Sequence, residues 1–340
     1  MTREKKLRVG VIGLGVGARH IAGYEEDPRC EVVALCDIDR EKLANASLRY
    51  PNLRVSTNPL DILVDETINA VSIATYDDVH AEQVVIAVEH GKHVFVEKPL
   101  CQNQCEFDNI VNCLNANRNV KMSTNFILRK TPRFIELRRR IQNNRLGNIY
   151  YLEGDYDYGR LNKLTEGWRS KIPTYSVTHG GAIHLIDLEM WLTGKRVREV
   201  FAYGTDLATK DTNYCGYDMV TALLSFEDGL IGKISANFGS VTPHHHKVCV
   251  YGTLGAFNQG HMGAMYSFTR VPNSGFETVD DPYPNTDKGD MLPTFVKSIL
   301  DLSEPDVTTQ EMLDTMAVSL AVEASLTSQQ PETVCYATLN

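Results

Sequence analysis

Short runs of consecutive apolar residues recur along the first third of the chain and alternate with segments that have helical spacing. A continuous apolar run is typical of a strand that is buried on both faces of a parallel sheet. Strands and helices in alternation predict βαβ units and therefore a Rossmann domain. The expected strands lie at residues 7–12, 31–37, 70–75, 94–96 and 120–123, with helices over 81–90 and 104–115.

From residue 149 the pattern changes to alternating positions, which is typical of half-buried strands. Residues 219–226 and 230–238 predict a hairpin around Glu227-Asp228-Gly229. The fold class is therefore α/β, with a dinucleotide-binding Rossmann domain over residues 1–123. Residues 124–340 are expected to form a substrate-binding and oligomerisation domain with a large, mostly antiparallel sheet. Its helices are expected over 132–143, from residue 179 to Trp191, and over 294–302 and 309–328.

Composition narrows the class of protein. The chain has 340 residues, enough for two cores, and its 43% hydrophobic and 23% charged residues are typical of a soluble globular protein. A net charge of −9 argues against nucleic acid as a partner, and no apolar run approaches the roughly 18 residues of a membrane span. The charged start lacks the apolar core of a signal peptide, and the eight cysteines include no Cys-x-x-Cys pair. We therefore expect a cytoplasmic protein with reduced thiols.

Glycines follow the first expected strand in the order that dinucleotide-binding loops use. Gly13 permits a tight turn, and Gly15 lets backbone approach a pyrophosphate. The third position of the fingerprint falls on Ala18, unless the loop is one residue shorter and Gly17 serves instead. The candidate cofactor-binding residues in this loop are Gly13, Gly15, Val16 and Gly17.

An acidic residue ends the second expected strand. Asp37 follows the glycine loop at close to the spacing of about 20 residues expected of a ribose-binding acid, and would accept hydrogen bonds from both ribose hydroxyls of NAD. Arg40 would favour NADP, so NAD is the expected cofactor and NADP the alternative. A plain helix cap is the competing interpretation of Asp37. Ile38 and Arg40 join Asp37 as candidate cofactor-binding residues.

The strand at 94–96 runs into Glu97-Lys98-Pro99, which would lie at the carboxyl edge of the sheet. In open α/β sheets ligands bind at that edge. A lysine is well placed there to meet a substrate, although a charged strand end before an ordinary turn proline is the alternative. We also predict a cis peptide bond between Lys98 and Pro99. Thr75, Tyr76 and His80 are expected at the same edge, as cofactor-binding residues.

The sequence resembles the glucose–fructose oxidoreductase/inositol dehydrogenase (Gfo/Idh/MocA) family in the order and spacing of five motifs. These are Gly13-Leu14-Gly15, Asp37, Thr75, His80 and Glu97-Lys98-Pro99. The resemblance covers nearly the whole chain. It implies hydride transfer between nicotinamide and a hydroxyl of a sugar, nucleotide sugar or cyclitol. It also implies that Lys98 meets the substrate, and that Glu97, Lys98 and Asn125 lie at the cofactor.

Aromatic and basic side chains gather between residues 156 and 169. Rings can stack on a sugar face and guanidinium groups bind phosphate, which suits a polyhydroxylated substrate that carries a phosphate. Packing of the rings on helices is the alternative. The candidate substrate-binding residues here are Tyr156, Tyr158, Arg160, Trp168 and Arg169.

His184 and Asp187 are three residues apart and share a helix face. In the family that the chain resembles, the histidine and the acid of this segment face the substrate. The sequence departs from many family members at Gly180, where they carry an aspartate. His179 is the candidate substitute for that acid.

The run His244-His245-His246 suggests a metal site, but adjacent histidines on a strand point to opposite faces. We therefore expect no metal, and contact between one of these histidines and the substrate. The apolar residues on both faces of the hairpin at 219–238 predict a homodimer or homotetramer through the sheet.

Oxidation of a hydroxyl requires a base, because the proton leaves oxygen as hydride leaves carbon. Histidine titrates near neutrality, whereas lysine needs burial or a nearby positive charge. We therefore assign His184 as general acid/base and Lys98 as the group that stabilises the reacting oxygen, while Asp187 binds a neighbouring hydroxyl. Two alternatives stay open: an NAD-dependent glycoside hydrolase that retains its cofactor, and a non-catalytic ligand-binding regulator.

Overall fold

The structure is a computed structural model that describes residues 6–172 and 175–339. The chain forms two compact units. The first comprises the described residues up to Ile127, then Thr286–Leu313 and the described residues from Ala337; the second comprises the described residues of Leu128–Asn285 and Asp314–Tyr336. Within the part of the chain that is described, no helix is long and apolar enough to cross a membrane.

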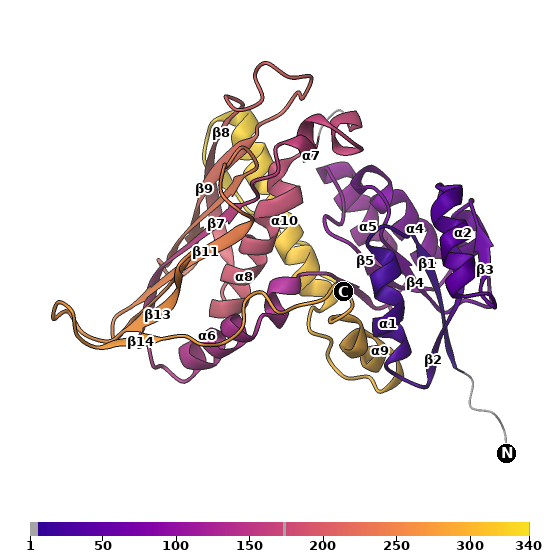
Figure 1. The fold of residues 1–340 in the computed structure, drawn as a ribbon, viewed down its shortest axis with the longest axis horizontal. Helices are drawn as coiled ribbons and strands as arrows, with labels where there is room; N and C mark the ends of the chain where they lie inside the picture. The colour runs from indigo at the N-terminus through magenta and orange to yellow at the C-terminus, as the bar shows by residue number, and fades with distance from the viewer. Residues whose placement is uncertain (1–5, 173–174, 340) are drawn as a thin grey trace. The chain divides into compact units, whose positions relative to one another are not determined.

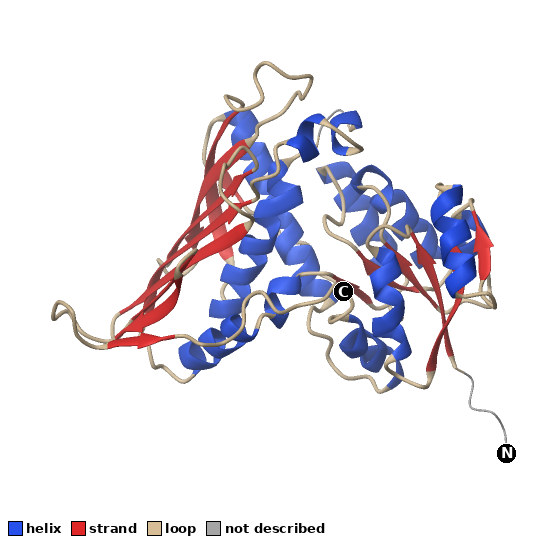
Figure 2. Ribbon diagram, viewed as in Figure 1, coloured by secondary structure: helices blue, strands red, loops and turns tan. Residues whose placement is uncertain are grey.

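The first unit contains a six-stranded sheet in the order β3-β2-β1-β4-β5-β6, and every pairing within it is parallel (Figures 1 and 2). The predicted Rossmann sheet is confirmed. The strands are β1 (Leu7–Ile12), β2 (Cys30–Cys36), β3 (Arg54–Ser56), β4 (Ala70–Ile73), β5 (His93–Val96) and β6 (Met122–Thr124). The helices are α1 (His20–Glu25), α2 (Arg40–Arg49), α3 (Leu60–Leu63), α4 (His80–Glu89), α5 (Gln104–Ala116) and α9 (Leu292–Leu300).

The segment Thr286–Leu313 returns to the first unit, although the sequence division at residue 123 placed it in the second domain. The reason is packing on the parallel sheet. The ring of Phe295 on α9 lies 5.6 Å from that of Phe95 on β5. Ser123 donates a hydrogen bond of 2.8 Å from its hydroxyl to the carbonyl of Val307. The first unit thus acquires a helix from a distant part of the chain.

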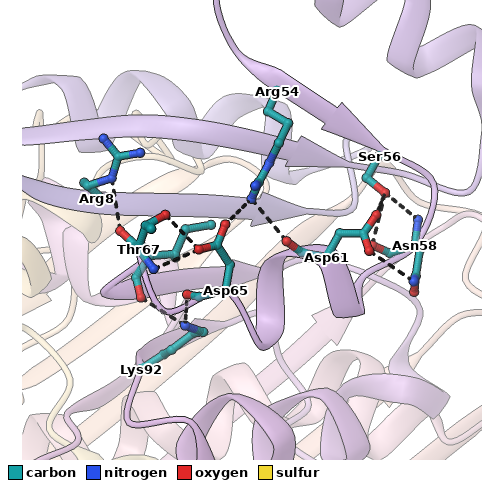
Figure 3. Close-up of polar contacts among 9 residues, drawn as sticks. Arg8, Arg54, Ser56, Asn58, Asp61, Asp65, Thr67 and Lys92 are labelled. Carbon is teal, nitrogen blue, oxygen red and sulfur yellow. Dashed lines mark hydrogen bonds and ion pairs between the residues drawn. The ribbon is translucent and has the colours of Figure 1, made fainter.

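A polar network runs along the loops before β4 and β5, at the amino-terminal edge of this sheet, and continues through Arg54 to the loop after β3 (Figure 3). Lys92, which is 1% exposed, donates to the backbone carbonyls of Asp65 and Ile68. Burial lowers the pKa of Lys92. Hydrogen bonds from Thr67, together with Arg54, hold the pKa of Asp65 at about 2. These charges are matched within the network, so it stabilises the loop before β4.

The second unit is built on a nine-stranded sheet in the order β14-β13-β12-β11-β7-β10-β9-β8-β15. Only β7 and β10 pair in parallel among the described pairings, so the predicted mostly antiparallel sheet is confirmed. The strands are β7 (Ile149–Asp157), β8 (Val197–Thr205), β9 (Met219–Phe226), β10 (Ile231–Asn237), β11 (His245–Gly252), β12 (Ala256–Gly260), β13 (Gly263–Ser267), β14 (Phe276–Thr278) and β15 (Glu332–Thr333).

Helices cover one face of this sheet, as Figure 2 shows. On β7, Ile149, Leu152, Gly154 and Tyr156 are the buried positions. A Cβ at Gly154 would lie 3.1 Å from Leu185 on α8. The alternate positions carry Glu153 and Asp155. The helices are α6 (Pro132–Gln142), α7 (Asn162–Thr165), α8 (Ile183–Thr193) and α10 (Thr309–Ser328), the last of which begins in the first unit.

Candidate active site

The glycine loop after β1 has the geometry of a phosphate cradle. Gly13 has a φ of +88°, and a Cβ there would lie 2.2 Å from the carbonyl oxygen of Ala74, so only glycine fits. A Cβ at Gly15 would meet nothing within 4 Å, which leaves room for a ligand beside the backbone. A Cβ at Gly17 would lie 3.1 Å from Val11 on β1. Gly17 therefore serves the close-packing position that the sequence left open between Gly17 and Ala18.

Asp37 lies directly after β2 and is 7% exposed. Its carboxylate accepts hydrogen bonds from the backbone amides of Leu14 (2.7 Å) and Asp39 (2.8 Å). Asp39, not Asp37, caps α2 by accepting from the amide of Glu41, so the interpretation of Asp37 as a plain cap is wrong. Because a carboxylate has about four acceptor positions, Asp37 can also accept from ribose hydroxyls. The neighbouring Ile38 and Arg40 are exposed.

His80 ties together two loops at the carboxyl edge of the sheet. Its ring is 1% exposed, with Nδ1 2.7 Å from the carbonyl oxygen of Pro99 and Nε2 3.3 Å from that of Thr75. These contacts favour a role in positioning the Lys98-Pro99 loop over the direct cofactor contact expected from the sequence. Tyr76, beside Thr75, is 42% exposed at the same edge. The peptide bond between Lys98 and Pro99 is cis, as predicted.

Glu97 is a buried acid at the end of β5, next to Lys98. It accepts a hydrogen bond from the amide of Asn125 (2.8 Å), and the Nε2 atom of His20 lies 3.3 Å away. Burial alone would raise the pKa of Glu97, but Lys288, His20 and Lys98 outweigh burial and hold this pKa well below its usual range. The carboxylate is thus a fixed negative charge beside Lys98.

Sequence reasoning missed His20 and Lys288 as partners of Glu97. His20 is fully buried, and its Nδ1 atom lies 2.7 Å from the hydroxyl of Ser72 on β4. The amide of Asn125 also donates to the backbone carbonyl of Lys288 (3.0 Å). These residues come from separate elements, and no spacing in the sequence connects them. Only the position of His20, shortly after the glycine loop, could have marked it as a candidate site residue.

In the second unit, rings gather around Tyr156 at the end of β7. Tyr156 stacks on Tyr158 (5.7 Å between centroids), Phe238 (6.0 Å) and His184 (6.2 Å). The rings of His244 and His246 are roughly perpendicular to that of Tyr156, with centroids 5.1 and 5.0 Å away. Three residues predicted from the sequence are therefore brought together, namely Tyr156, Tyr158 and His184, while Phe238 was missed. An aromatic panel beside a histidine offers a stacking surface for a ring-shaped substrate.

The predicted basic residues stack on rings of the same unit. Arg160 lies over Tyr158 at 5.1 Å, and Arg169 lies over Trp168 at 4.4 Å. Arg169 also lies over Tyr175 and donates a hydrogen bond to its hydroxyl (2.9 Å). Stacking holds both guanidinium groups in place while leaving their edges able to donate.

Asp187 differs from its expected environment. It is completely buried on α8 and forms a bidentate ion pair with Arg129, with nitrogen–oxygen distances of 2.6 to 3.1 Å. We expected this carboxylate to bind a substrate hydroxyl, but the geometry favours a role in fixing α8. Arg129 was not among the predicted site residues, because nothing in the sequence pairs it with an acid 58 positions away.

His184 lies one residue after the start of α8, which follows a π-helical segment at Thr178–Ala182. Such segments are frequent at functional sites. His179, the candidate substitute for the absent aspartate, is buried with Nδ1 2.8 Å from the hydroxyl of Ser319 on α10. That contact directs one ring nitrogen of His179 to α10.

The three consecutive histidines alternate between faces of the sheet as predicted. His244 and His246 lie near Tyr156, whereas the ring of His245 lies 4.4 Å from that of His261. Burial lowers the pKa of His245 to about 4, helped by His261 and Arg133. Across residues 6–172 and 175–339 there is no group of three metal-binding side chains placed to hold an ion.

Glu189 on α8 predicts a pH-dependent stability. It is 3% exposed, and neither carboxylate oxygen has a hydrogen-bond partner among the described residues. Burial raises the pKa of Glu189 well above its usual range, although Lys233 opposes the shift. The folded chain thus keeps a proton that the unfolded chain releases near pH 4.3. Stability should therefore fall by up to about 1.4 kcal/mol per pH unit above that value, until the raised pKa is passed.

Replacing Glu189→Gln removes this titration. We expect the free energy of unfolding in urea to become less dependent on pH between about pH 5 and 8, and to exceed that of the wild type at the upper end. Glu227→Gln, at an exposed turn, is the matched control and should change neither. An unchanged pH dependence in Glu189→Gln would show that this carboxyl is ionised in the folded protein.

Two family models match the chain. One, described as an oxidoreductase family with an NAD-binding Rossmann fold, matches residues 7–126, and the other, a GFO/IDH/MocA C-terminal domain, matches residues 134–258. The chain belongs to the Gfo/Idh/MocA family. It is an NAD-binding oxidoreductase of this family, and the phosphate cradle at Gly13–Gly17 and the acid at Asp37 lie within the matched NAD-binding region.

Its relatives include enzymes that act on cyclitols and sugars. A myo-inositol 2-dehydrogenase of Thermotoga maritima is 24% identical, over 94% of this chain and 96% of that protein. A scyllo-inositol 2-dehydrogenase (NAD(+)) of Bacillus subtilis is 25% identical, over 82% of this chain and 81% of that protein. A levoglucosan dehydrogenase solved in complex with NADH shares the fold, with a TM-score of 0.83 at 21% identity over 98% of this chain and all of that one.

Proposed function

We propose that the protein transfers a hydride between a hydroxyl of a sugar, nucleotide sugar or cyclitol and NAD. The observation that carries the proposal is Lys98, held at the carboxyl edge of the parallel sheet beside the buried, ionised Glu97. A lysine next to a buried carboxylate at this edge is placed to meet a ligand, because ligands of open α/β sheets bind at the carboxyl ends of the strands. The names of the relatives, inositol and levoglucosan dehydrogenases, support a cyclic polyol as substrate.

The residues of the first unit fit NAD. Gly15 leaves space for a pyrophosphate, Gly13 and Gly17 allow the loop its close contacts, and Asp37 retains acceptor capacity for ribose. When bound, NAD would supply the hydride acceptor. Lys98 would donate a hydrogen bond to the reacting oxygen and stabilise charge there, while Glu97 holds Lys98 in place. His184 is the residue that we predict to take the proton of the hydroxyl.

A screen of free sugars, nucleotide sugars and inositols with NAD, followed by NADH absorbance, tests the proposal. Formation of NADH with at least one cyclic polyol is the expected result. Release of free sugar from a glycoside without net NADH would instead identify a hydrolase that retains its cofactor. Cofactor binding without turnover of any polyol would favour a ligand-binding regulator.

Cofactor choice gives a second prediction. NAD should bind more tightly than NADP, because the carboxylate of Asp37 repels a 2′-phosphate. Asp37→Ala should weaken NAD binding and reduce the difference in affinity between NAD and NADP, because Arg40 would still favour the 2′-phosphate. Calorimetric titration of the wild type and of Asp37→Ala with both cofactors measures this. Tighter binding of NADP to the wild type by tenfold would overturn the assignment of Asp37.

We also propose that the sheet of the second unit mediates self-association. Its face away from the helices exposes Tyr203 (67%), Leu223 (51%) and Ile231 (49%). Apolar groups gathered on an open sheet face favour contact with a second copy. Light scattering at micromolar concentration should give the mass of a dimer or tetramer, and Leu223→Asp should shift the mass toward the monomer. A monomeric wild type would contradict this proposal.

A further inference from the structure

The hydroxyl of Tyr175 occupies the space that a side chain at position 180 would fill. A Cβ built on Gly180 would lie 2.0 Å from the hydroxyl oxygen of Tyr175 and 2.7 Å from its Cζ atom. No residue larger than glycine fits there while Tyr175 keeps its place. Position 180 is also where the sequence departs from the family it resembles, so this phenol stands where another side chain would otherwise project.

Gly180 and His184 lie on the same side of their helical segment. Gly180 belongs to the π-helical turn and His184 to the first turn of α8. A π turn takes slightly more than four residues and an α turn slightly fewer, so a spacing of four is close to one full turn. The Tyr175 hydroxyl therefore approaches the helix one turn before His184, on the face that carries the proposed general base.

Arg169 fixes the phenol. Its Nε atom donates a hydrogen bond of 2.9 Å to the hydroxyl oxygen of Tyr175, and its guanidinium lies 5.4 Å from the centre of the ring. Trp168 packs edge-on against the same ring at 5.9 Å, and the phenol is 5% exposed. A hydrogen bond received from a charged donor strengthens the O–H of the phenol as a donor in turn. Tyr175 is thus a rigid, polarised hydrogen-bond donor.

We propose that Tyr175 is a further catalytic residue, which donates a hydrogen bond to a substrate oxygen beside the one that His184 deprotonates. The proposal rests on the proposed function and adds a group to its site. In the proposed oxidation, bound NAD would supply the hydride acceptor, and His184 would take the hydroxyl proton. Tyr175 keeps its own proton throughout, so its contribution is binding and orientation of the substrate rather than proton transfer.

Tyr175→Phe removes only the hydroxyl and tests this role. With a polyol that the wild type oxidises, we expect kcat/KM to fall at least about tenfold. Calorimetry should show weaker binding of the same polyol to the complex with NADH, while NADH binding itself stays unchanged. Tyr266→Phe, which removes another buried hydroxyl from the second unit, is the matched control and should alter neither value.

Arg169→Ala, made alone and together with Tyr175→Phe, provides a second test. If Arg169 acts through Tyr175, the double variant should lose little more than Tyr175→Phe alone, because the two effects share one hydrogen bond. Fully additive losses would overturn the role of Arg169, and wild-type kcat/KM in Tyr175→Phe would overturn that of Tyr175. A wild type that oxidises no polyol would instead reject the proposed function.

Discussion

Alanine in place of Lys98 or of His184 should lower the turnover of the true substrate by at least about a hundredfold. Loss of a general base typically costs about 10²–10⁴-fold, and loss of a charged donor at the reacting oxygen costs about 10²–10³-fold. Binding of NAD should persist in both variants, since the glycine loop and Asp37 are unchanged. Steady-state kinetics measure the turnover, and calorimetric titration measures the affinity for NAD.

The two variants should also differ in their pH profiles. The wild-type rate of oxidation should rise with pH as the general base loses its proton, and His184→Ala should lose that dependence. Lys98→Ala should keep it at a lower overall rate. Lys195→Ala and His90→Ala, on the surface, are matched controls and should retain wild-type rates. Near-normal turnover in either site variant would exclude that residue from the chemistry.

The sequence predicted the first unit well because its functional residues lie directly after strands. Gly13, Asp37 and Lys98 each follow a short apolar run, and parallel strands bring such positions to one edge of a sheet. In this unit, the local pattern that identifies a strand therefore also predicts where the residue after it lies in the sheet. The return of Thr286–Leu313 to this unit was not predictable in the same way, because α9 resembles any amphipathic helix.

For the second unit, the sequence predicted the type of sheet but not which side chains meet across it. Alternation along β7 located Tyr156 and Tyr158. Their partners Phe238, directly after β10, and His246, on β11, are brought close only by the order of strands in the sheet. The pairing of β7 with β10 skips two strands of the sequence, and its pairing with β11 skips three, which no local pattern records. Contacts of this kind depend on register, and sequence periodicity specifies a face but no register.

The buried pair of Arg129 and Asp187 shows what such distant contacts imply for stability. Both side chains are almost inaccessible, at 4% and 0% exposure, so the ion pair compensates two charges that are withdrawn from water. Removal of one partner from a buried pair leaves an uncompensated charge and typically costs about 3–5 kcal/mol. We therefore expect Asp187→Ala to lower the free energy of unfolding by that amount, as measured by chemical denaturation.

The double variant Arg129→Met, Asp187→Leu separates charge from packing. Replacement of a whole buried pair by apolar side chains is often neutral or stabilising, so the double variant should recover most of the lost stability. Asp301→Ala, which breaks an exposed pair with Arg29, is the control and should cost much less. The double variant also decides the role of Asp187 in the reaction. If the pair only fixes α8, the double variant should have the same KM for the substrate as the wild type. If Asp187 binds a substrate hydroxyl directly, KM should rise in the double variant although its stability is restored.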